Sequence, residues 1–158
     1  MPSASPKGDL PDNGAKPGAI AGKEALMFHD TESFSSFAVP DIDVARRFYR
    51  ETLGLEVTDS AEAGLIELHV TGAAPVLVYP KPDHQPAVFT VLNFVVPDIT
   101  ASVRELNAKG VELERYDLGG DARPDDMGIY RGQGPSIGWF TDPAGNIISV
   151  LERPPAAG

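Results

Sequence analysis

The sequence predicts an α+β fold made of two tandem modules, each with the element order β-α-β-β-β. The first observation is a repeat: FAVPDID at 37–43 returns as FVVPDIT at 94–100, 57 positions later. The second is that each copy joins an apolar, strand-like stretch to a helical pattern that ends at a glycine, Gly54 or Gly110. The third is that further strand-like stretches follow each helix. One supersecondary unit therefore occurs twice.

The first module begins with a strand predicted over 34–39 and a helix predicted over 40–54. Asp43 is a suitable N-cap for this helix, because a short acidic side chain accepts hydrogen bonds from amides of the first turn. The apolar stripe of the helix recurs at helical spacing and consists of Ala45, Phe48, Tyr49 and Thr52. Strands are then predicted over 55–59, 64–70 and 75–80, followed by a turn-rich linker over 81–87.

The second module repeats this order. A strand is predicted over 88–96 and a helix over 97–110, with Thr100 as N-cap and with Val103 and Leu106 on the buried side. The remaining strands are predicted over 111–117, 135–141 and 146–152, and the turn DPAG joins the last two.

The first thirty residues have a different composition from the rest of the chain. They are rich in Pro, Gly, Ala and Ser and show no apolar periodicity, so they cannot bury enough apolar surface to offset the entropy of ordering. We therefore expect a disordered tail over 1–30. The domain is predicted over 31–155, with module one at 33–81 and module two at 88–153.

The composition excludes several classes of function. A net charge of −10 argues against nucleic acid, whose binding needs clustered Lys and Arg. The acidity either favours a cationic ligand or serves only to keep the protein soluble. No apolar stretch approaches the roughly 18 residues of a membrane span, so we expect no membrane partner. The chain contains no cysteine, which excludes disulfides and thiolate chemistry and fits a cytoplasmic location.

Two segments resemble a known family: VPDIDVARRFYRETLGLEV, which opens the first module, and GWFTDPAGNIISVLE, which closes the second. They are similar to the vicinal oxygen chelate superfamily, which includes glyoxalase I, extradiol dioxygenases, and the fosfomycin- and bleomycin-resistance proteins. The resemblance covers residues 33–153. It implies two curved sheets that face each other as a cup, a small-molecule ligand in that cup, helices outside, and a homodimer as in many relatives.

For relatives that use a metal, the resemblance implies four ligand positions. In this sequence those positions carry Phe34, Val91, Ser149 and either Val78 or Leu77. Phenylalanine, valine and leucine have no lone pairs, and a neutral serine hydroxyl is a poor ligand for an oxygen-preferring divalent ion. We therefore expect neither a metal nor another cofactor.

The strand parity of the family also implies which side chains line the cup. The hydrogen-bonding groups among them are Ser36, Asn93 and Ser149, and Trp139 either adds a stacking surface or belongs to the core. The irregular stretch 118–138 would place Tyr130 and Arg131 near the mouth of the cup, although a surface role is the alternative for Arg131. The predicted lining comprises Phe34, Ser36, Ala38, Val91, Asn93, Val95, Ile147, Ser149 and Leu151.

Glu67 and His69 are the candidates for acid–base catalysis. Residues two apart on a strand share a face, and Ile66, Leu68 and Val70 supply the opposite, apolar face. Histidine titrates near neutral pH, so the pair could transfer protons. The alternative is a solvated polar face of an antiparallel sheet.

Two functions remain open. The first is a metal-independent protein that binds or sequesters a small molecule, with a hydrophobic cation as the best match to the apolar cup and the acidic charge. The second is a glyoxalase-like lyase or isomerase that uses Glu67 and His69 or an unconventional metal site. The fold alone does not choose between them, because one fold hosts many functions.

Overall fold

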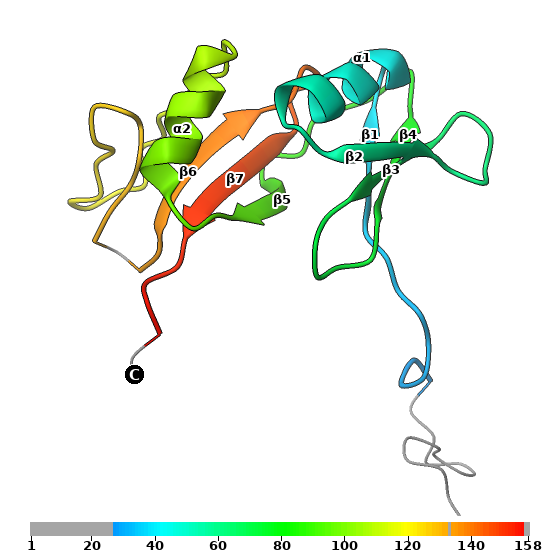
Figure 1. Ribbon diagram of the computed structural model, residues 1–158, viewed down its shortest axis with the longest axis horizontal. Coiled ribbons are helices and arrows are strands. Elements are labelled where there is room, and N and C mark those ends of the chain that lie inside the picture. The colour runs from blue at the N-terminus through cyan, green and yellow to red at the C-terminus, as the bar shows by residue number, and fades with distance from the viewer. Residues whose placement is uncertain (1–26, 133, 157–158) are drawn as a thin grey trace, which may run out of the picture. The chain divides into compact units, whose positions relative to one another are not determined.

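The computed structural model describes residues 27–132 and 134–156 (Figure 1). The chain divides into two units, Met1–Ser33 and Phe34–Gly158. In the described part of the first unit, residues 27–30 form a turn, next to which the Thr31 hydroxyl donates to the carbonyl oxygen of Phe28 (2.9 Å). The rest of the predicted disordered tail lies outside the described residues.

The first module forms a four-stranded mixed sheet. Its strands are β1 (Ser36–Val39), β2 (Glu56–Asp59), β3 (Ile66–His69) and β4 (Val76–Pro80), in the order β1-β4-β3-β2. β1 runs parallel to β4, whereas β3 is antiparallel to both of its neighbours. The predicted helix forms as α1 (Ile42–Arg47), which continues directly into a π-helical segment, η2 (Phe48–Thr52).

The second module forms a three-stranded mixed sheet with one helix. Its elements are β5 (Thr90–Val95), α2 (Ile99–Ala108), β6 (Ser136–Thr141) and β7 (Ile147–Glu152). The strand order is β5-β7-β6, with β5 parallel to β7 and β6 antiparallel to it. The predicted α+β class with two tandem modules is thereby confirmed. Gly54 and Gly110, the predicted helix ends, have the positive φ angles (70° and 82°) that glycine adopts without steric penalty.

The predicted strand over 111–117 is wrong as a continuous element. Within this stretch only an isolated bridge forms, between Glu114 and Trp139. Leu113 explains how the segment is held, because it is 9% exposed and fills space that two glycines leave open. A Cβ atom at Gly138 would overlap the Leu113 side chain, and one at Gly128 would lie 2.8 Å from the Cβ of Leu113. Side-chain packing replaces the missing hydrogen-bond ladder.

Both predicted N-caps are wrong by two residues. The Asp41 carboxylate, not that of Asp43, accepts hydrogen bonds from two amides of the first turn of α1 (3.0 and 3.1 Å). In the second module Asp98, not Thr100, caps α2 by accepting from the Ala101 amide (2.9 Å). Both aspartates have the extended backbone that an N-cap requires. The caps are therefore the aspartates of the repeated Val-Pro-Asp motif.

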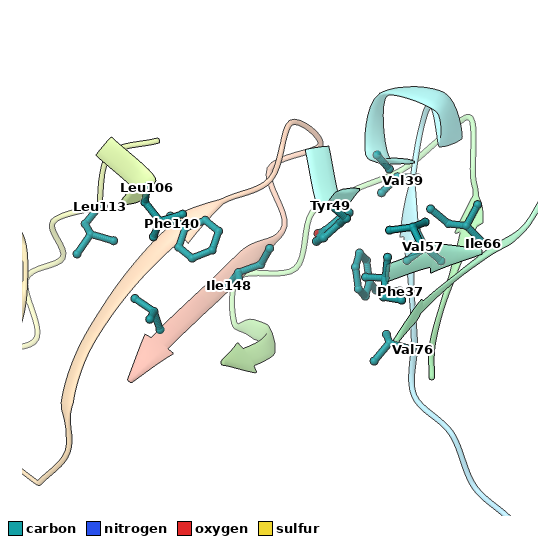
Figure 2. Packing of buried hydrophobic residues seen from close by; sticks show 14 of the residues in the cluster. Phe37, Val39, Tyr49, Val57, Ile66, Val76, Leu106, Leu113, Phe140 and Ile148 are labelled. Atoms are coloured by element: carbon teal, nitrogen blue, oxygen red, sulfur yellow. The ribbon is translucent and has the colours of Figure 1, made fainter. Parts of the chain in front are cut away.

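The core lies between the helices and one face of each sheet (Figure 2). Alternation along the strands fixes that face, since side chains of a strand point in turn to opposite sides. In module one the strand residues of this core are Phe37, Val39, Val57, Ile66, Leu68, Val76 and Val78. In module two they are Phe140, Ile148 and Val150, which pack with Ile99, Val103 and Leu106 of α2. The other face of each sheet, turned away from the helices, is called the open face below.

A buried carboxylate joins the two modules. Asp142, in the turn between β6 and β7, is 4% exposed, and its Oδ2 accepts a hydrogen bond from the hydroxyl of Tyr49 in η2 (2.7 Å). The same oxygen accepts from the side-chain amide of Asn146 (2.9 Å), which also donates to the carbonyl oxygen of Ala38 in β1 (2.9 Å). Oδ1 accepts from the backbone amides of Ala144 and Asn146 (2.9 Å each).

Replacing Tyr49 with phenylalanine removes one hydrogen bond to this carboxylate and keeps the ring in the core. A hydrogen bond to a charged group stabilises by about 1.5–3 kcal/mol. We expect Tyr49→Phe to lower the free energy of unfolding by about 1.5–3 kcal/mol, measured by urea denaturation at pH 7. The matched control is Tyr79→Phe, whose ring lies on the open face of the first sheet, and its effect should be much smaller.

The same pair of proteins tests a pH dependence. Desolvation raises the pKa of Tyr49 far above its ordinary value, and the charge and hydrogen bond of Asp142 raise it further. Above about pH 10 an unfolded tyrosine loses its proton, whereas folded Tyr49 keeps it, so this residue makes stability fall as pH rises. The free energy of unfolding should therefore decline less steeply above pH 10 in Tyr49→Phe than in the wild type. Parallel declines would contradict a buried, protonated Tyr49.

Candidate functional site

Three of the predicted ligand-binding residues lie in one row across the open face of the second sheet. Asn93 of β5 is the register partner of Ser149 in β7, and Ser149 is the partner of Trp139 in β6. The Ser149 hydroxyl is completely buried and donates to the side-chain oxygen of Asn93 (2.5 Å). Asn93 itself is exposed, so its amide nitrogen is the group of this pair that can donate to a ligand.

Val91 departs from the predicted lining of the cup. The pairing of β5 with β7 slips by one residue between Thr90 and Leu92, which is a β-bulge at Val91. Thr90, the partner of Ile147, therefore takes the place on the open face that the prediction gave to Val91, and Val91 packs against the buried cluster. The Thr90 hydroxyl accepts a hydrogen bond from the indole nitrogen of Trp139 (3.1 Å), which fixes the orientation of that ring.

Trp139 is the centre of an aromatic cluster. The ring centroid of Tyr130 lies 5.4 Å away and that of Tyr116 lies 5.8 Å away, both in edge-to-face geometry. Tyr130 is buried, and its hydroxyl donates to the backbone oxygen of Tyr116 and accepts from the backbone nitrogen of the same residue (2.7 Å each). Of the three rings, Trp139 and Tyr116 keep partly exposed surface.

A carboxylate lies beside these rings. Glu114 pairs with Trp139 in the isolated bridge, which places their side chains on the same face, and Tyr116 follows two residues later. Partial desolvation raises the pKa of Tyr116, and the negative charge of Glu114 and the neighbouring Tyr130 raise it further. Sequence reasoning missed Glu114 and Tyr116. Their alternation within 111–117 was a signal for a shared face, but no feature of that stretch showed that it lies against Trp139.

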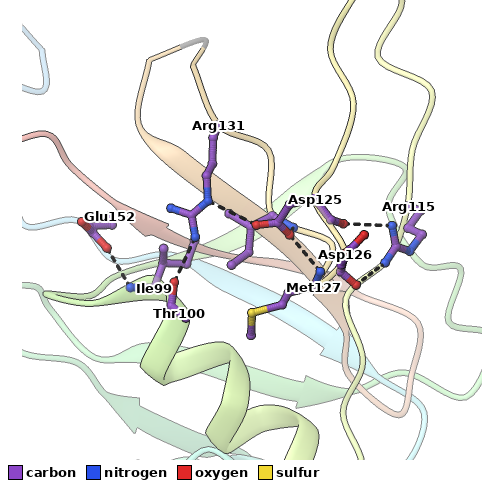
Figure 3. A network of polar contacts seen from close by, with 9 residues as sticks. Ile99, Thr100, Arg115, Asp125, Asp126, Met127, Arg131 and Glu152 are labelled. Atoms are coloured by element: carbon purple, nitrogen blue, oxygen red, sulfur yellow. Dashed lines mark hydrogen bonds and ion pairs between the residues drawn. The ribbon is translucent and has the colours of Figure 1, made fainter.

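Arg131 takes part in a polar network of the loop that precedes β6 (Figure 3). Its guanidinium forms an ion pair with Asp125 (3.2 Å) and donates to the hydroxyl of Thr100 in the first turn of α2 (2.9 Å). Arg115 donates to the backbone oxygens of Asp125 and Asp126 (3.1 and 2.8 Å). These contacts give Arg131 a structural role, in addition to any contact that it makes with a ligand.

Asp125 organises this loop. Its Oδ1 accepts hydrogen bonds from the backbone amides of Met127 and Ile129 (2.9 Å each). Partial desolvation alone would raise the pKa of Asp125, but the hydrogen bonds from Ile129, Arg131 and Met127 outweigh it and hold the pKa below its ordinary value. A carboxylate that stays ionised keeps the stretch before Tyr130 in one conformation, and thereby positions the aromatic cluster.

Glu67 and His69 lie on the open face of the first sheet, since Ile66 and Leu68 between them are completely buried on the other face. The His69 Nε2 atom lies 2.7 Å from the hydroxyl oxygen of Thr58 in β2 and 4.0 Å from a carboxylate oxygen of Glu67. Glu56 is the register partner of His69. The cluster thus contains an imidazole, a hydroxyl and two carboxylates, each partly or largely accessible.

The donor set does not fit the metal site that the family implies. Phe34 precedes β1 and is 68% exposed, and Val78 is completely buried in the core, so Leu77 is the residue of that pair on the open face. Together with Val91 and Ser149, these side chains offer a single hydroxyl oxygen. No group of three or more His, Asp or Glu side chains that could hold a metal ion occurs among residues 27–132 and 134–156. Over the same residues, no helix is long and apolar enough to cross a membrane.

Comparisons with known proteins agree with this fold. A family model described as the Glyoxalase/Bleomycin resistance protein/Dioxygenase superfamily matches residues 29–150. A search of curated proteins found no match. Among solved structures, the chain is similar to TnmS3, an antibiotic binding protein from Streptomyces sp. CB03234, with 21% identity and a TM-score of 0.58 over 79% of this chain and 98% of that one.

Two further solved structures are also similar to this chain. The fosfomycin resistance protein FosX from Listeria monocytogenes shares 16% identity, with a TM-score of 0.58 over 79% of this chain and 94% of its own. Lactoylglutathione lyase from Agrobacterium tumefaciens shares 21% identity, with a TM-score of 0.55 over 78% of this chain and 93% of its own. At identities this low, the structural similarity shows a common fold and nothing more.

Proposed function

Because the chain belongs to the glyoxalase/bleomycin resistance protein/dioxygenase superfamily, we propose that it binds a small, hydrophobic, cationic molecule on the open face of its second sheet, without a metal. The observation that carries this proposal is the position of the Glu114 carboxylate beside the partly exposed rings of Trp139 and Tyr116. An aromatic face attracts a cation through its quadrupole, and a neighbouring carboxylate adds a Coulomb attraction.

The remaining groups of the open face supply orientation rather than charge. Ser149 and Asn93 form a neutral pair next to Trp139, and the Asn93 amide is left to donate to an acceptor of the ligand. Val95, on the same face, is 53% exposed and offers apolar contact. A few polar groups on an apolar wall are typical of small-molecule sites.

Two further observations support a cationic ligand. The net charge of −10 raises the local concentration of cations around the protein and repels anions. TnmS3, which has a similar fold, is described as an antibiotic binding protein. Binding without turnover is therefore compatible with this architecture, and sequestration needs no catalytic group.

We include pairing of two chains in the proposal. A single chain exposes several large apolar side chains. Their exposed fractions include 93% for Val88, 67% for Phe89 and 53% for Val95. A second copy that covers them would also enclose the open face, which one chain leaves accessible. Light scattering of the purified protein should give the mass of a dimer, and a monomeric mass at micromolar concentration would contradict this part of the proposal.

The ligand proposal predicts selective binding of a planar cation. N-methylacridinium should bind in calorimetry and quench the fluorescence of Trp139, the single tryptophan of the chain, whereas acridine-9-carboxylate should not bind measurably. Glu114→Gln removes one exposed charge beside the rings, and a contribution of about 0.5–1 kcal/mol corresponds to a loss of affinity of about two- to fivefold.

Glu51→Gln is the matched control, because Glu51 is also exposed and carries the same charge, but it lies on η2, away from the open face and from Trp139. It should leave the affinity within experimental error of the wild type. Equal binding of the anionic and cationic acridines, or equal losses for the two glutamine variants, would refute the proposed site.

Catalysis is the second candidate, and the short contact between His69 and Thr58 favours it (2.7 Å). An imidazole that is hydrogen-bonded to a hydroxyl and lies near the carboxylate of Glu67 has the groups that an acid–base step requires. A glyoxalase-like lyase or isomerase would place a substrate proton within reach of this cluster. Membership of the superfamily and the cluster of His69, Thr58 and Glu67 together support this reaction class.

If the cluster is catalytic, a screen with electrophilic carbonyl substrates should detect turnover, and His69→Ala should abolish it. The loss for one general acid–base residue is typically about 10²–10⁴-fold. His84→Ala, in the linker between the modules, serves as the control and should keep full activity. Turnover that survives in a folded His69→Ala protein would exclude this mechanism.

A further inference from the structure

A concave site lies on the helix-covered side of the second sheet, where this sheet and α2 meet the end of η2. It is a pocket of about 250 Å³. Its apolar wall comes from both modules, and its polar residues stand on α2 and at the end of η2. The lining consists of Thr52, Leu53, Leu55, Phe94, Val96, Ser102, Glu105, Leu106, Lys109, Phe140 and Val150.

This pocket is separate from the open face. Phe94 and Val150 in its wall are the neighbours in sequence of Asn93 and Ser149, and neighbours on a strand point to opposite sides of the sheet. A molecule in the pocket would therefore be separated from Trp139 by the sheet itself. The inference below goes beyond the proposed function and does not depend on it.

The wall of the pocket is apolar, and its centre is buried. Leu106, Phe140 and Val150 are at most 9% exposed and belong to the buried cluster, and Figure 2 shows the first two packed together. A volume of about 250 Å³ exceeds the roughly 150 Å³ of an apolar cavity that accepts benzene, and lies just below the roughly 300 Å³ where pockets for drug-sized molecules begin. One or two fused rings match this volume.

The rim of the pocket offers one donor and one acceptor of opposite charge. The ammonium of Lys109 donates to the carbonyl oxygens of Glu51 and Thr52 at the end of η2 (3.1 and 2.9 Å), which leaves one of its three N–H groups. Glu105 lies one helical turn before Lys109 on the same side of α2, and its carboxylate only accepts. A hydroxyl both donates and accepts, so it complements this rim better than a charged group, which one of the two residues would repel.

We propose that this pocket binds a neutral aromatic molecule of one or two rings that carries a hydroxyl group. The rings occupy the apolar wall formed by β5, β6, β7 and α2. The hydroxyl lies at the rim, where it donates to Glu105 and accepts from Lys109. Because the wall contains Leu53 and Leu55 of the first module, the bound molecule also stabilises the junction between the two modules.

The test uses the full-length protein and 2-naphthol as the probe. Methyl-detected NMR should show saturable shift changes at the methyl groups of Leu53, Leu106 and Val150, with one molecule bound per chain in calorimetry. The indole signal of Trp139 should not move. 2-Naphthoate, which has the same rings and a negative charge, should bind at least fivefold more weakly.

Variants separate the pocket from unspecific binding. Ser102→Phe places a ring in the mouth of the pocket and should abolish binding, whereas Ala101→Phe adds the same ring on the exposed side of α2 and should not. Leu55→Trp fills the pocket from the first module and should act like Ser102→Phe, which keeps the test valid if one variant does not fold. Glu105→Gln should weaken binding several-fold, and Arg104→Gln, on the same helix but outside the pocket, should not.

Two results would overturn the inference. One is the absence of saturable shifts at the three methyl groups up to the solubility limit of 2-naphthol. The other is shift changes at Trp139 instead, with equal behaviour of Ser102→Phe and Ala101→Phe, which would place the probe on the open face. Neither result bears on the cation selectivity of the open face, because that is measured with acridinium and with Glu114→Gln.

Discussion

The buried carboxylate of Asp142 is the interaction on which the rest of the fold depends. Removing a carboxylate from water costs several kcal/mol unless its oxygens are satisfied. Asp142 receives four hydrogen bonds: two from backbone amides of its own turn, one from the Asn146 side chain and one from Tyr49. Both segments that carry the family resemblance, FYRETLG and FTDPAGN, contribute to this network. Tyr49, Asp142 and Asn146, which form the network, fix the junction between the modules.

The two modules share the entry to the helix but have diverged on their open faces. In both, an aspartate after Val-Pro caps the helix and a glycine ends it. The open face of the first sheet carries a polar cluster, in which His69 lies 2.7 Å from Thr58 and 4.0 Å from Glu67. The open face of the second sheet is aromatic, with Trp139 and its neighbours. The two modules are therefore alike where the helix begins and ends, and they differ on their open faces.

The sequence predicted the features that depend on local pattern. Alternation in β3 gave the buried face correctly, because one register exposes Ile66 and Leu68 and the other buries them. For β4 the choice between Val78 and Leu77 was left open, and the structure buries Val78. Both N-caps were misplaced by two residues, since each helix entry contains two residues of capping type and only the backbone conformation decides between them. The class of the fold followed from the order of the elements.

Features that depend on contacts between distant segments were not predictable. The bulge at Val91 arises from the pairing of β5 with β7, and the alternation of β5 carries no sign of it. Within 111–117, where no continuous strand forms, Leu113 fills the space beside Gly138, which lies 25 positions later in the chain. For the same reason Glu114 and Tyr116 were missed, because their importance comes from Trp139. Arg131 was predicted as a candidate contact, and its partners Asp125 and Thr100 became known only from the structure.

On the open face of the second sheet, the carboxylate lies at an exposed position and not at the buried position of a metal ligand. This placement suits the organic cation that we propose as the ligand. Position 149, where the family resemblance implies a carboxylate, is completely buried. A carboxylate there would need a metal ion or another cation to balance it. Ser149 and Asn93 satisfy each other without charge, so the centre of the row is stable when empty. The carboxylate of this face, Glu114, stands instead at an exposed position where water solvates it. An organic cation can then approach Glu114 while its apolar body covers Trp139, and no buried charge has to be neutralised in either state.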